Sequence, residues 1–260
     1  MAQQLDIIFW DVQHGNAAYL NTPNGKTFVI DLGVGSFDNS DKTFSPLAHL
    51  KSRYKITSLG GVIITHPHTD HLDDIFRFDS LSPKVLYKSR HLTGAEIRGA
   101  NRPNDKVIID KYLEIDRRYS GKVEPGEDPF DPALNGGVSF QRFIPLSCGR
   151  GNLNNHSVVT VVSFAGCKAL IPGDNEKPSW TELLAKPQFV KAITGTHILL
   201  APHHGREQGF CEELFEHIEP LLTIVSDGSV CDTSARDRYR SRSRGWKVWG
   251  ITVNQRSATA

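Results

Sequence analysis

Cysteine is scarce in this sequence, and its scarcity excludes two kinds of stabilisation. The four cysteines among 260 residues lie far apart and form no Cys-x-x-Cys pair. Such spacing argues against a disulfide framework and against a cysteine-bound zinc site. The fold therefore has to rest on a buried apolar core, and a hydrophobic content of 38% is ample for one in a chain of this length.

Long apolar runs and a surplus of one charge are also missing. No run approaches the roughly 18 apolar residues of a membrane span. The N-terminus, MAQQLDIIFWDV, lacks the basic region of a signal peptide. A net charge of +1 gives no general attraction to nucleic acid, so any anion-binding surface has to be local. We therefore expect a cytoplasmic protein without membrane contact, of unknown oligomeric state.

Short strand-like segments fill the first quarter of the sequence. Four β-branched or aromatic runs bounded by turn residues predict strands, and they read LDIIFWDV, AAYLNTP, KTFVIDLG and GVIIT. The first three follow each other too closely for helices to intervene, so we expect antiparallel neighbours. Between the third and the fourth, SPLAHLKSRY predicts a helix with Ser45 as N-cap and Pro46 at its first position.

Strands and helices alternate in the rest of the chain, apart from one long segment. This order predicts an α/β sandwich with sheets inside and helices outside, formed by residues 1–260 as a single domain. The exception covers residues 88–137 approximately, where two turn-rich stretches flank a candidate helix, IIDKYLEIDRRY. We expect an irregular insertion there, either a lid over the substrate or a solvated excursion.

The segment HPHTDH, residues 66–71, contains four metal-ligand side chains directly after a strand. His66 and His68 leave the strand end toward one point, and Asp70 and His71 can reach a second point nearby. Neutral imidazoles and carboxylates are ligands that zinc and similar divalent ions accept. A polar turn with incidental histidines is the weaker interpretation of such a dense group.

This segment matches the HxHxDH signature of the metallo-β-lactamase superfamily, and further motifs follow in that family's order. FWDVQHGNAAYLNTPNGKTFVIDLG, NNHSVVTVVSFAGCKALIPGD and LLAPHHG resemble the hydrolase domain of ComEC-type DNA-uptake proteins. The resemblance spans residues 5 to about 228 and implies a four-layer αββα sandwich. Two departures stand out. The family's Gly-Gln-Gly-Asp turn reads Gln13-His14-Gly15-Asn16 here, and the sequence lacks the membrane segments of full ComEC proteins.

The resemblance implies a dinuclear metal centre. It assigns His66 and His68 to one divalent ion, and Asp70 and His71 to the other. Asp174 would bridge the two ions, because two dications repel each other unless an anion lies between them. Asp70 would also be catalytic, since its free oxygen can orient the nucleophile. We expect Zn²⁺ as the metal, with Mn²⁺ as the alternative.

The other histidines leave alternatives open. One of His203 and His204 would complete the second metal site; we favour His204 as the ligand and His203 as a catalytic group near the phosphate. His156, which lies one strand pair before Asp174, is either the third ligand of the first metal or a substrate contact. His14 either faces the site or makes a structural hydrogen bond.

A run of arginines late in the sequence bears on the substrate. TSARDRYRSRSRG has an arginine at every second position from 236 to 244. In an extended chain these side chains would share one face, and guanidinium groups suit phosphate oxygens. We therefore predict that Ser234, Arg236 and Arg238 bind substrate at the rim of the metal site. A solvated charge run is the alternative.

Three functions remain open on the sequence alone. We favour a phosphodiesterase or nuclease that acts on nucleic acid, or on a small phosphate-containing molecule such as a nucleotide, through a metal-activated hydroxide. The second is an ester, lactone or amide hydrolase of the same fold, which would need an apolar pocket from residues 88–137, a segment that looks polar. The third is a non-catalytic metal-binding module.

Overall fold

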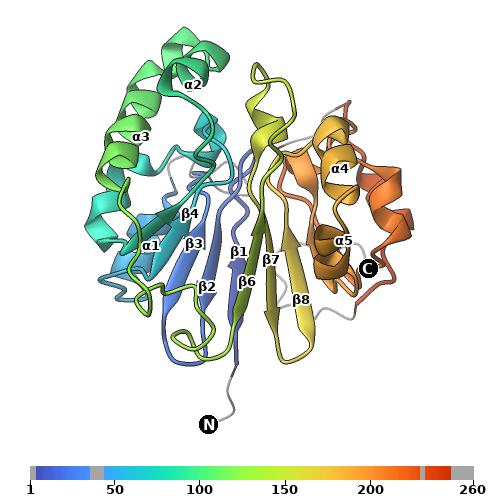
Figure 1. Cartoon of the computed structure of the whole chain (residues 1–260), viewed down its shortest axis with the longest axis horizontal. Helices are drawn as coiled ribbons and strands as arrows, with labels where there is room; N and C mark the ends of the chain where they lie inside the picture. Colours follow the sequence, from blue (N-terminus) through green and yellow to red (C-terminus); the bar gives the residue numbers. More distant parts are fainter. Residues whose placement is uncertain (1–3, 36–43, 229–231, 247–260) are drawn as a thin grey trace.

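Two five-stranded sheets pack against each other, face to face, at the centre of the computed structural model of this chain (Figure 1). The structure describes residues 4–35, 44–228 and 232–246. The first sheet contains, in spatial order, β1 (Asp6–Phe9), β2 (Ala18–Asn21), β3 (Thr27–Ile30), β4 (Gly61–Ile63) and β5 (Val85–Tyr87). The second contains, from one edge to the other, β10 (Leu222–Ile224), β9 (Ile198–Leu200), β8 (Cys167–Ile171), β7 (Val159–Phe164) and β6 (Ser139–Phe143).

Both sheets follow the same plan of strand directions. The first three strands of each half are antiparallel neighbours, which confirms the expectation for the N-terminal segments. The next two strands are added in parallel, each after a crossover. Parallel strands end at the same edge of a sheet, so the loops after β3, β4 and β5 meet at one edge, and those after β8, β9 and β10 do the same.

Helices cover the outer face of each sheet, which makes the four-layer αββα sandwich that the sequence predicted (Figure 1). The helices of the first half are α1 (Pro46–Ser52), α2 (Gly94–Ala100) and α3 (Lys106–Arg118). Those of the second half are α4 (Lys177–Leu184), α5 (Pro187–Ile193) and α6 (Arg236–Ser241). Among the described residues, no helix combines the length and the apolar character that crossing a membrane requires.

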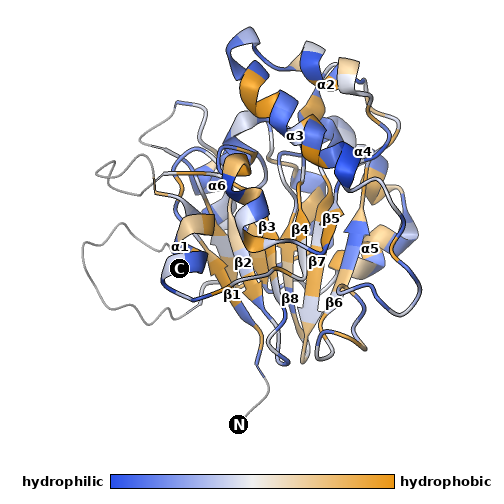
Figure 2. Ribbon diagram, turned by 90° about the vertical axis from the view of Figure 1, so that its left-hand side faces the viewer, coloured by the Kyte–Doolittle hydropathy of each residue, from blue (hydrophilic) through white to orange (hydrophobic). Residues whose placement is uncertain are grey.

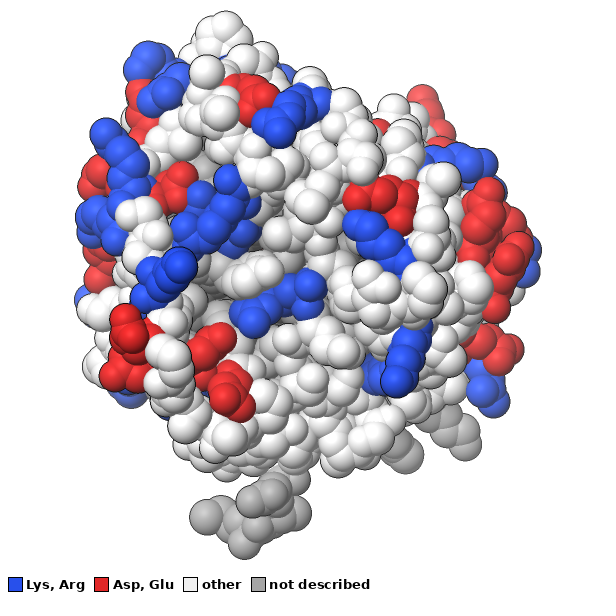
Figure 3. Space-filling model, in the orientation of Figure 1, with Lys and Arg blue, Asp and Glu red and all other residues white. Residues whose placement is uncertain are grey.

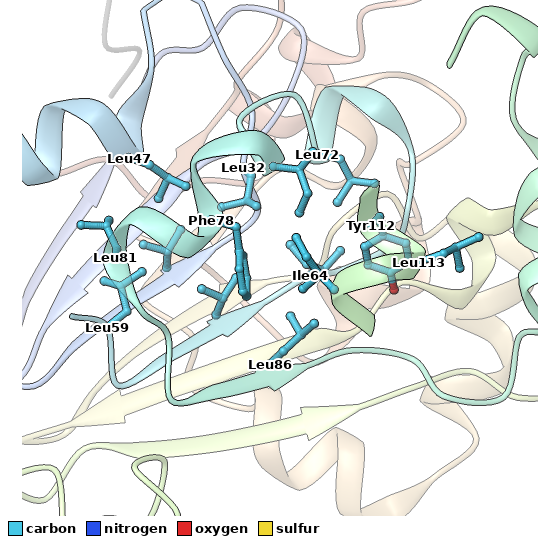
Figure 4. Close-up of a cluster of buried hydrophobic side chains, with 14 of the residues drawn as sticks. Leu32, Leu47, Leu59, Ile64, Leu72, Phe78, Leu81, Leu86, Tyr112 and Leu113 are labelled. Atoms are coloured by element: carbon cyan, nitrogen blue, oxygen red, sulfur yellow. The ribbon is translucent and has the colours of Figure 1, made fainter. Parts of the chain in front are cut away.

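Three clusters of buried apolar side chains fill the spaces between these layers. One lies between the two sheets and contains Phe28, Ile63 and Ile171. A second joins the first sheet to its helices, where Phe78, Leu86 and neighbouring side chains pack together (Figure 4). The third joins the second sheet to its helices. The strands are accordingly largely hydrophobic, whereas the helices mix hydrophobic and hydrophilic residues (Figure 2).

The helix α1 begins where the sequence predicted. The Ser45 side chain accepts a hydrogen bond from the backbone N–H of Ala48, and Pro46 occupies the first turn. A side-chain oxygen at the N-cap satisfies one of the four N–H groups that a helix start leaves unpaired. The Ser45 hydroxyl in turn donates to the buried carboxylate of Asp74, at 2.6 Å. This hydrogen bond links the start of α1 to the segment that follows the HPHTDH loop.

The segment 88–137 is more regular than we expected. Helices α2 and α3 occupy much of it, and their apolar faces, including Ile97, Tyr112 and Ile115, belong to the core. The candidate helix IIDKYLEIDRRY is confirmed as α3, whereas α2 was not predicted. Only residues 119–137 form a long irregular connection, which crosses in front of the sheets before β6 (Figure 1).

Candidate metal centre

The loop after β4 carries the HPHTDH segment. Its start is fixed by Thr65, whose backbone N–H and hydroxyl donate to the fully buried carboxylate of Asp31, at 2.7 and 2.8 Å. A short 3-10 turn at Thr69–His71 ends the loop. His66 and His71 are buried, whereas Asp70 is partly exposed. The loop thus holds ligand-type side chains at the edge of the sheet, with one carboxylate open to solvent.

Four of the predicted ligands form one compact cluster. A nitrogen or oxygen atom from each of Asp70, His71, Asp174 and His204 lies within 4.8 Å of the others. The His71 Nε2 atom is 3.2 Å from Asp174 Oδ1. The His204 Nε2 atom is 3.1 Å from Asp70 Oδ2 and 3.2 Å from Asp174 Oδ2. The structure therefore brings residues from both halves of the chain to one point.

A close approach between the two halves places Asp174 in this cluster. The preceding residue, Gly173, has a φ of +62°, and a Cβ atom there would lie 2.7 Å from the Cβ of Thr65. Only glycine fits both the conformation and the space. The Asp174 backbone N–H donates to the Ser157 hydroxyl at 3.1 Å. The IPGD motif therefore needs its glycine for the carboxylate to reach the loop after β4.

His204 reaches the cluster through an unusual backbone. Both His203 and His204 have left-handed φ values, 50° and 55°. Such conformations cost of order 1–3 kcal/mol each for a residue other than glycine. The His204 Nδ1–H donates to the Ser226 carbonyl at 3.1 Å, which holds the ring in place. Strain concentrated at two neighbouring histidines is typical of a functional site.

The hydrogen bonds of the histidines fit a bound cation. Nδ1 of His71 donates to Asp31 Oδ2 at 2.8 Å, and Nδ1 of His204 is engaged by Ser226. In a neutral ring, each Nε2 then presents a lone pair to the cluster. Both Nε2 atoms are buried and have no hydrogen-bond partner within the described residues. Two imidazole nitrogens and two carboxylates facing one another are a donor set that suits a divalent metal ion.

The pKa values of the cluster residues also fit a site for a divalent cation. Burial opposes the charged form of His204, but the Asp174 carboxylate, assisted by Asp70, raises its pKa to about 9. Burial likewise disfavours a charged His71, yet the surrounding carboxylates raise its pKa well above the usual value. Burial would raise the pKa of Asp174, but His204, His71 and His66 hold it well below its usual range. The cluster thus favours positive charge beside its aspartates, which a divalent ion would supply.

His66 and His68 lie beside this cluster. The His66 Nε2 atom is 3.9 Å from Asp174 Oδ2 and 3.0 Å from His68 Nδ1. Burial, together with the neighbouring His71, lowers the pKa of His66 well below its usual value. Burial also lowers the pKa of His68. Both rings are therefore neutral at physiological pH, the form in which imidazole binds metals.

His156 has different neighbours. It ends a 3-10 turn ahead of β7, and its Nδ1 atom lies 2.8 Å from the Nε2 atom of His91. The carbonyl oxygens of Pro145 and Gly149 lie 3.4 and 3.3 Å from its two ring nitrogens. The structure thus pairs His156 with His91, which sequence reasoning did not single out. A lone histidine in SRHLTG gives no signal of such a partner.

His203 lies next to the cluster and pairs with an acid. Its Nδ1 atom is 3.4 Å from Glu176 Oε1. The side-chain amides of Asn152 and Asn154 also donate to that carboxylate, at 2.8 and 3.0 Å. Glu176 thus fixes the histidine that was predicted to contact the substrate. Glu176 lies two residues after Asp174 in the sequence, and this proximity to the IPGD motif was a signal that we did not use.

The arginine run forms a helix rather than an extended strand. α6 begins at Arg236, so side chains at alternate positions spread around it instead of sharing one face. Arg238 stacks on the Phe210 ring, 3.8 Å from its centroid, and forms an ion pair with Glu207. Ser234 forms a single β-bridge with Arg206, and its hydroxyl accepts a hydrogen bond from the Arg236 backbone. Of the two conformations considered for this run, residues 236–241 therefore adopt the helical one, in which the arginines share no common face.

Arg206, to which no role was assigned from its sequence context, lies at the rim of the cluster. Its Nη2 atom is 3.2 Å from Asp227 Oδ1 and donates to His14 Nδ1, also at 3.2 Å. His14 Nε2 is 3.6 Å from Asp70 Oδ2, and its ring centroid is 4.3 Å from that of His204. Both alternatives for His14 are therefore met, because its ring faces the site while its Nδ1 atom lies at hydrogen-bonding distance from Arg206 and Asp227.

The departure at Asn16 also has a physical reason. The Asn16 amide donates to Asp31 Oδ2 at 3.0 Å, and both residues are buried. The amide group of Asn16 thus supplies the buried Asp31 carboxylate with one of its hydrogen bonds. Asp31 itself was not predicted as a site residue, although it closes the strand motif FVID.

Comparison with solved structures gives similar overall shapes at low identity. The metallo-beta-lactamase fold protein YhfI from Bacillus subtilis is 12% identical, with 93% of this chain and 95% of that chain covered and a TM-score of 0.49. A diphosphatase from the PhnP family is also 12% identical, with coverages of 88% and 78% and a TM-score of 0.43. AidC, a dizinc quorum-quenching lactonase, is 15% identical, with coverages of 61% and 55% and a TM-score of 0.39. These scores carry no argument about the substrate.

The family itself follows from the sequence. No curated protein matches the chain. Residues 10–209, however, match the family model described as "Metallo-beta-lactamase superfamily". That match covers most of the chain, including every residue of the cluster. The protein therefore belongs to the metallo-beta-lactamase superfamily, and it carries the histidine and aspartate cluster of a metal-dependent hydrolase.

Proposed function

We propose that the protein is a phosphodiesterase that cleaves nucleic acid or nucleotides at a dinuclear metal site. The observation that carries the proposal is the polar rim of the cluster. The half-exposed ring of His14, which Arg206 contacts from behind, lies beside Asp70 and His204, where a substrate would approach. N–H donors of this kind suit phosphate oxygens. An acyl or lactone substrate would instead need apolar lining.

The residues of the cluster would hold the two ions. Asp70, His71 and His204 would bind one, His66 and His68 the other, and Asp174 would lie between them. Two divalent ions in such a site supply a nucleophile at neutral pH and neutralise charge on the phosphoryl group. The structure leaves a cavity of about 10 Å³ against Asp174 and His204, which has the size of one water molecule.

Two side chains have separate tasks in this proposal. Asp70 is the more exposed of the two cluster carboxylates, at 22% against 5% for Asp174, so it can orient an attacking water molecule. His14 Nδ1 lies within hydrogen-bonding distance of both Arg206 Nη2 and Asp227 Oδ1, at 3.2 and 3.3 Å. In the tautomer that accepts from Arg206, the Nε2–H of His14 is left to donate to a phosphate oxygen. Arg206 is neutralised by Asp227, so its main role here is to position His14.

His203 would contact the substrate from the other side. Its pairing with Glu176 fixes the ring, as carboxylate partners do for catalytic histidines. A resemblance in sequence also supports a nucleic-acid substrate. The order of the motifs and the LLAPHHG segment resemble the hydrolase domains of ComEC-type proteins, whose substrates are nucleic acids. We therefore place this chain with them as part of the proposal.

A substrate panel tests the function. Purified protein loaded with Zn²⁺ or Mn²⁺ is assayed on bis-p-nitrophenyl phosphate, single-stranded DNA, nitrocefin and a lactone. We expect hydrolysis of the two phosphodiesters and none of the other two. The Asp70→Asn variant should be inactive with an unchanged circular dichroism spectrum, because it loses the group that orients the nucleophile.

The other outcomes each assign a different function. Hydrolysis of nitrocefin or the lactone alone would move the protein to the acyl hydrolases of this fold. No turnover of any substrate by the metal-loaded protein would indicate a binding module. An active and folded Asp70→Asn protein would refute the role given to Asp70 while leaving the substrate class intact.

A further inference from the structure

We propose that a basic groove along the edge strand β5 binds the phosphate backbone of a single-stranded nucleic acid. The proposal rests on the proposed function, because the groove would hold the part of a long nucleic acid that extends beyond the cleavage site. The groove has a volume of about 700 Å³. Its cationic lining, which defines the basic groove, consists of Lys26, Lys84, Arg90, Arg118 and Lys122.

The fold collects these residues from separate parts of the chain. Lys26 directly precedes β3, and Lys84 directly precedes β5. β4 alone separates these two strands, so the lysines start from backbones about 10 Å apart. Arg118 ends α3, and Lys122 lies on the irregular connection that follows. Figure 3 shows Lys and Arg side chains around a hollow on this face, over the part of the sheet where Figure 1 labels β4.

The charges of the groove are largely uncompensated. Within the part of the chain that the structure describes, Lys26, Lys84 and Lys122 form no ion pair with a carboxylate, and Arg90 bonds only to the Tyr119 carbonyl. Arg118 alone is paired, with Asp79. The same lining contains two acids, Glu124 and Glu127. Five cations against two acids leave a local positive surface on a chain whose net charge is only +1.

The arginine run offers much less free charge, although it is more conspicuous in the sequence. Arg238 and Arg242 both pair with Glu212, and Arg244 lies 3.9 Å from a Glu219 oxygen. Their helix belongs to the outer layer of the second sheet, where Tyr239 joins the core. The basic groove belongs to the first sheet. The two surfaces can therefore be tested against each other.

The groove and the metal centre lie toward the same edge of the first sheet, because Arg90 follows β5 and the HPHTDH segment follows β4, its parallel neighbour. Arg90 is followed by His91, whose ring contacts His156 at 2.8 Å. The next residue, Ser157, accepts the hydrogen bond from the Asp174 backbone. A strand bound along β5 would thus leave the groove at the edge where the cluster lies. The volume suits a flexible single chain with its phosphates on the lysines rather than a rigid duplex.

Binding measured against salt tests the proposal. The three unpaired lysines, Lys26, Lys84 and Lys122, are replaced together by Gln, and the matched control replaces Arg236, Arg238 and Arg240 by Gln. Both variants lose three charges. The probe is a fluorescent phosphorothioate oligo(dT), which resists hydrolysis, and its Kd for the metal-loaded protein is measured by anisotropy from about 50 to 200 mM salt.

Each phosphate contact contributes about 0.7 to the slope of log affinity against log salt for a single strand. We therefore expect the groove variant to lose about 2 from that slope, so that its affinity deficit shrinks about 20-fold across this salt range. The control variant should keep the slope of the wild type. Hydrolysis of bis-p-nitrophenyl phosphate should be unchanged in the groove variant, since a substrate this small does not extend to the three lysines and no catalytic group is altered.

The remaining outcomes overturn the proposal. Equal slopes for the groove variant and the wild type would show that the groove does not bind the strand. A loss confined to the control variant would assign binding to the arginine run. Competition by polyglutamate as strong as that by unlabelled oligo(dT) would identify an acidic protein as the partner. Failure of the wild type to hydrolyse bis-p-nitrophenyl phosphate would refute the proposed function alone, because binding is measured without turnover.

Discussion

The substitution Asp31→Asn should disable the metal centre without touching a ligand. One oxygen of Asp31 accepts from the Thr65 backbone at 2.7 Å. The other faces Nδ1 of His71 at 2.8 Å, the Thr65 hydroxyl at 2.8 Å and the Asn16 amide at 3.0 Å. The carboxylate thus keeps a hydrogen on Nδ1 of His71 and a lone pair on Nε2, the atom that faces Asp174.

An asparagine would reverse this arrangement. If its oxygen keeps the Thr65 N–H, its NH₂ group faces His71 and can donate to Nδ1. The hydrogen of a neutral ring then moves to Nε2, and that atom can no longer bind a metal. Loss of such supporting groups weakens metal affinity about 10- to 100-fold, which corresponds to about 1.4–2.7 kcal/mol. The Asn16 amide also loses its acceptor, which costs about 1–3 kcal/mol of stability.

A chelator competition assay gives the metal affinity, and urea unfolding of the metal-free protein gives the stability. The matched control is Asp74→Asn, which removes another fully buried carboxylate whose partners are Ser45 and Leu47. We expect both variants to lose stability but only Asp31→Asn to lose metal affinity. Wild-type metal affinity in Asp31→Asn would refute the tautomer argument.

Four further predictions follow from the site and the core. His66→Ala should lower the metal content, measured by elemental analysis, from about two ions per chain. His14→Ala should reduce kcat/KM for a phosphodiester about 10-fold or more, because a charged hydrogen bond is lost, and His14→Gln should restore part of it. Burial and Glu213 raise the pKa of Cys211 to about 11, so iodoacetamide at about pH 8 should modify the exposed Cys167 first, as mass spectrometry would show. Phe78→Ala should cost about 3–5 kcal/mol in urea unfolding, because Phe78 is fully buried.

The features that the sequence revealed are the ones encoded by neighbouring residues. The HPHTDH segment, the N-cap at Ser45 and the antiparallel start of the first sheet depend on local spacing, and the structure contains each of them. The conformation of the arginine run stayed open in the sequence, because alternation gives a common face only in an extended chain, and α6 is a helix. The helix α3 was predicted from IIDKYLEIDRRY, but the short α2 was missed because turn residues surround it.

Other features depend on contacts that no short motif encodes. His14 and Arg206 are separated by 192 positions, yet their side chains touch at the rim of the cluster. Asp31 becomes a partner of His71 only because β3 and β4 are parallel neighbours that end at one edge. The residues of the basic groove likewise come from separate elements: the hairpin between β2 and β3, the two ends of β5 and the end of α3. Such sets are defined by the pairing of strands, which a single sequence does not reveal.

The location of the cluster between the two halves has a consequence for folding. Asp70 and His71 come from the first sheet's half, and Asp174 and His204 from the second, so a bound ion would close a covalently continuous loop of roughly a hundred residues. It would act as a reversible crosslink that exists only in the folded state, so it would stabilise the fold by mass action, whereas a disulfide acts by restricting the unfolded chain. At an ion concentration of about 1,000 times the Kd, binding adds about 4 kcal/mol to the stability. We therefore expect metal supply in the cell to set how often the halves separate, and with it how quickly proteases remove the protein.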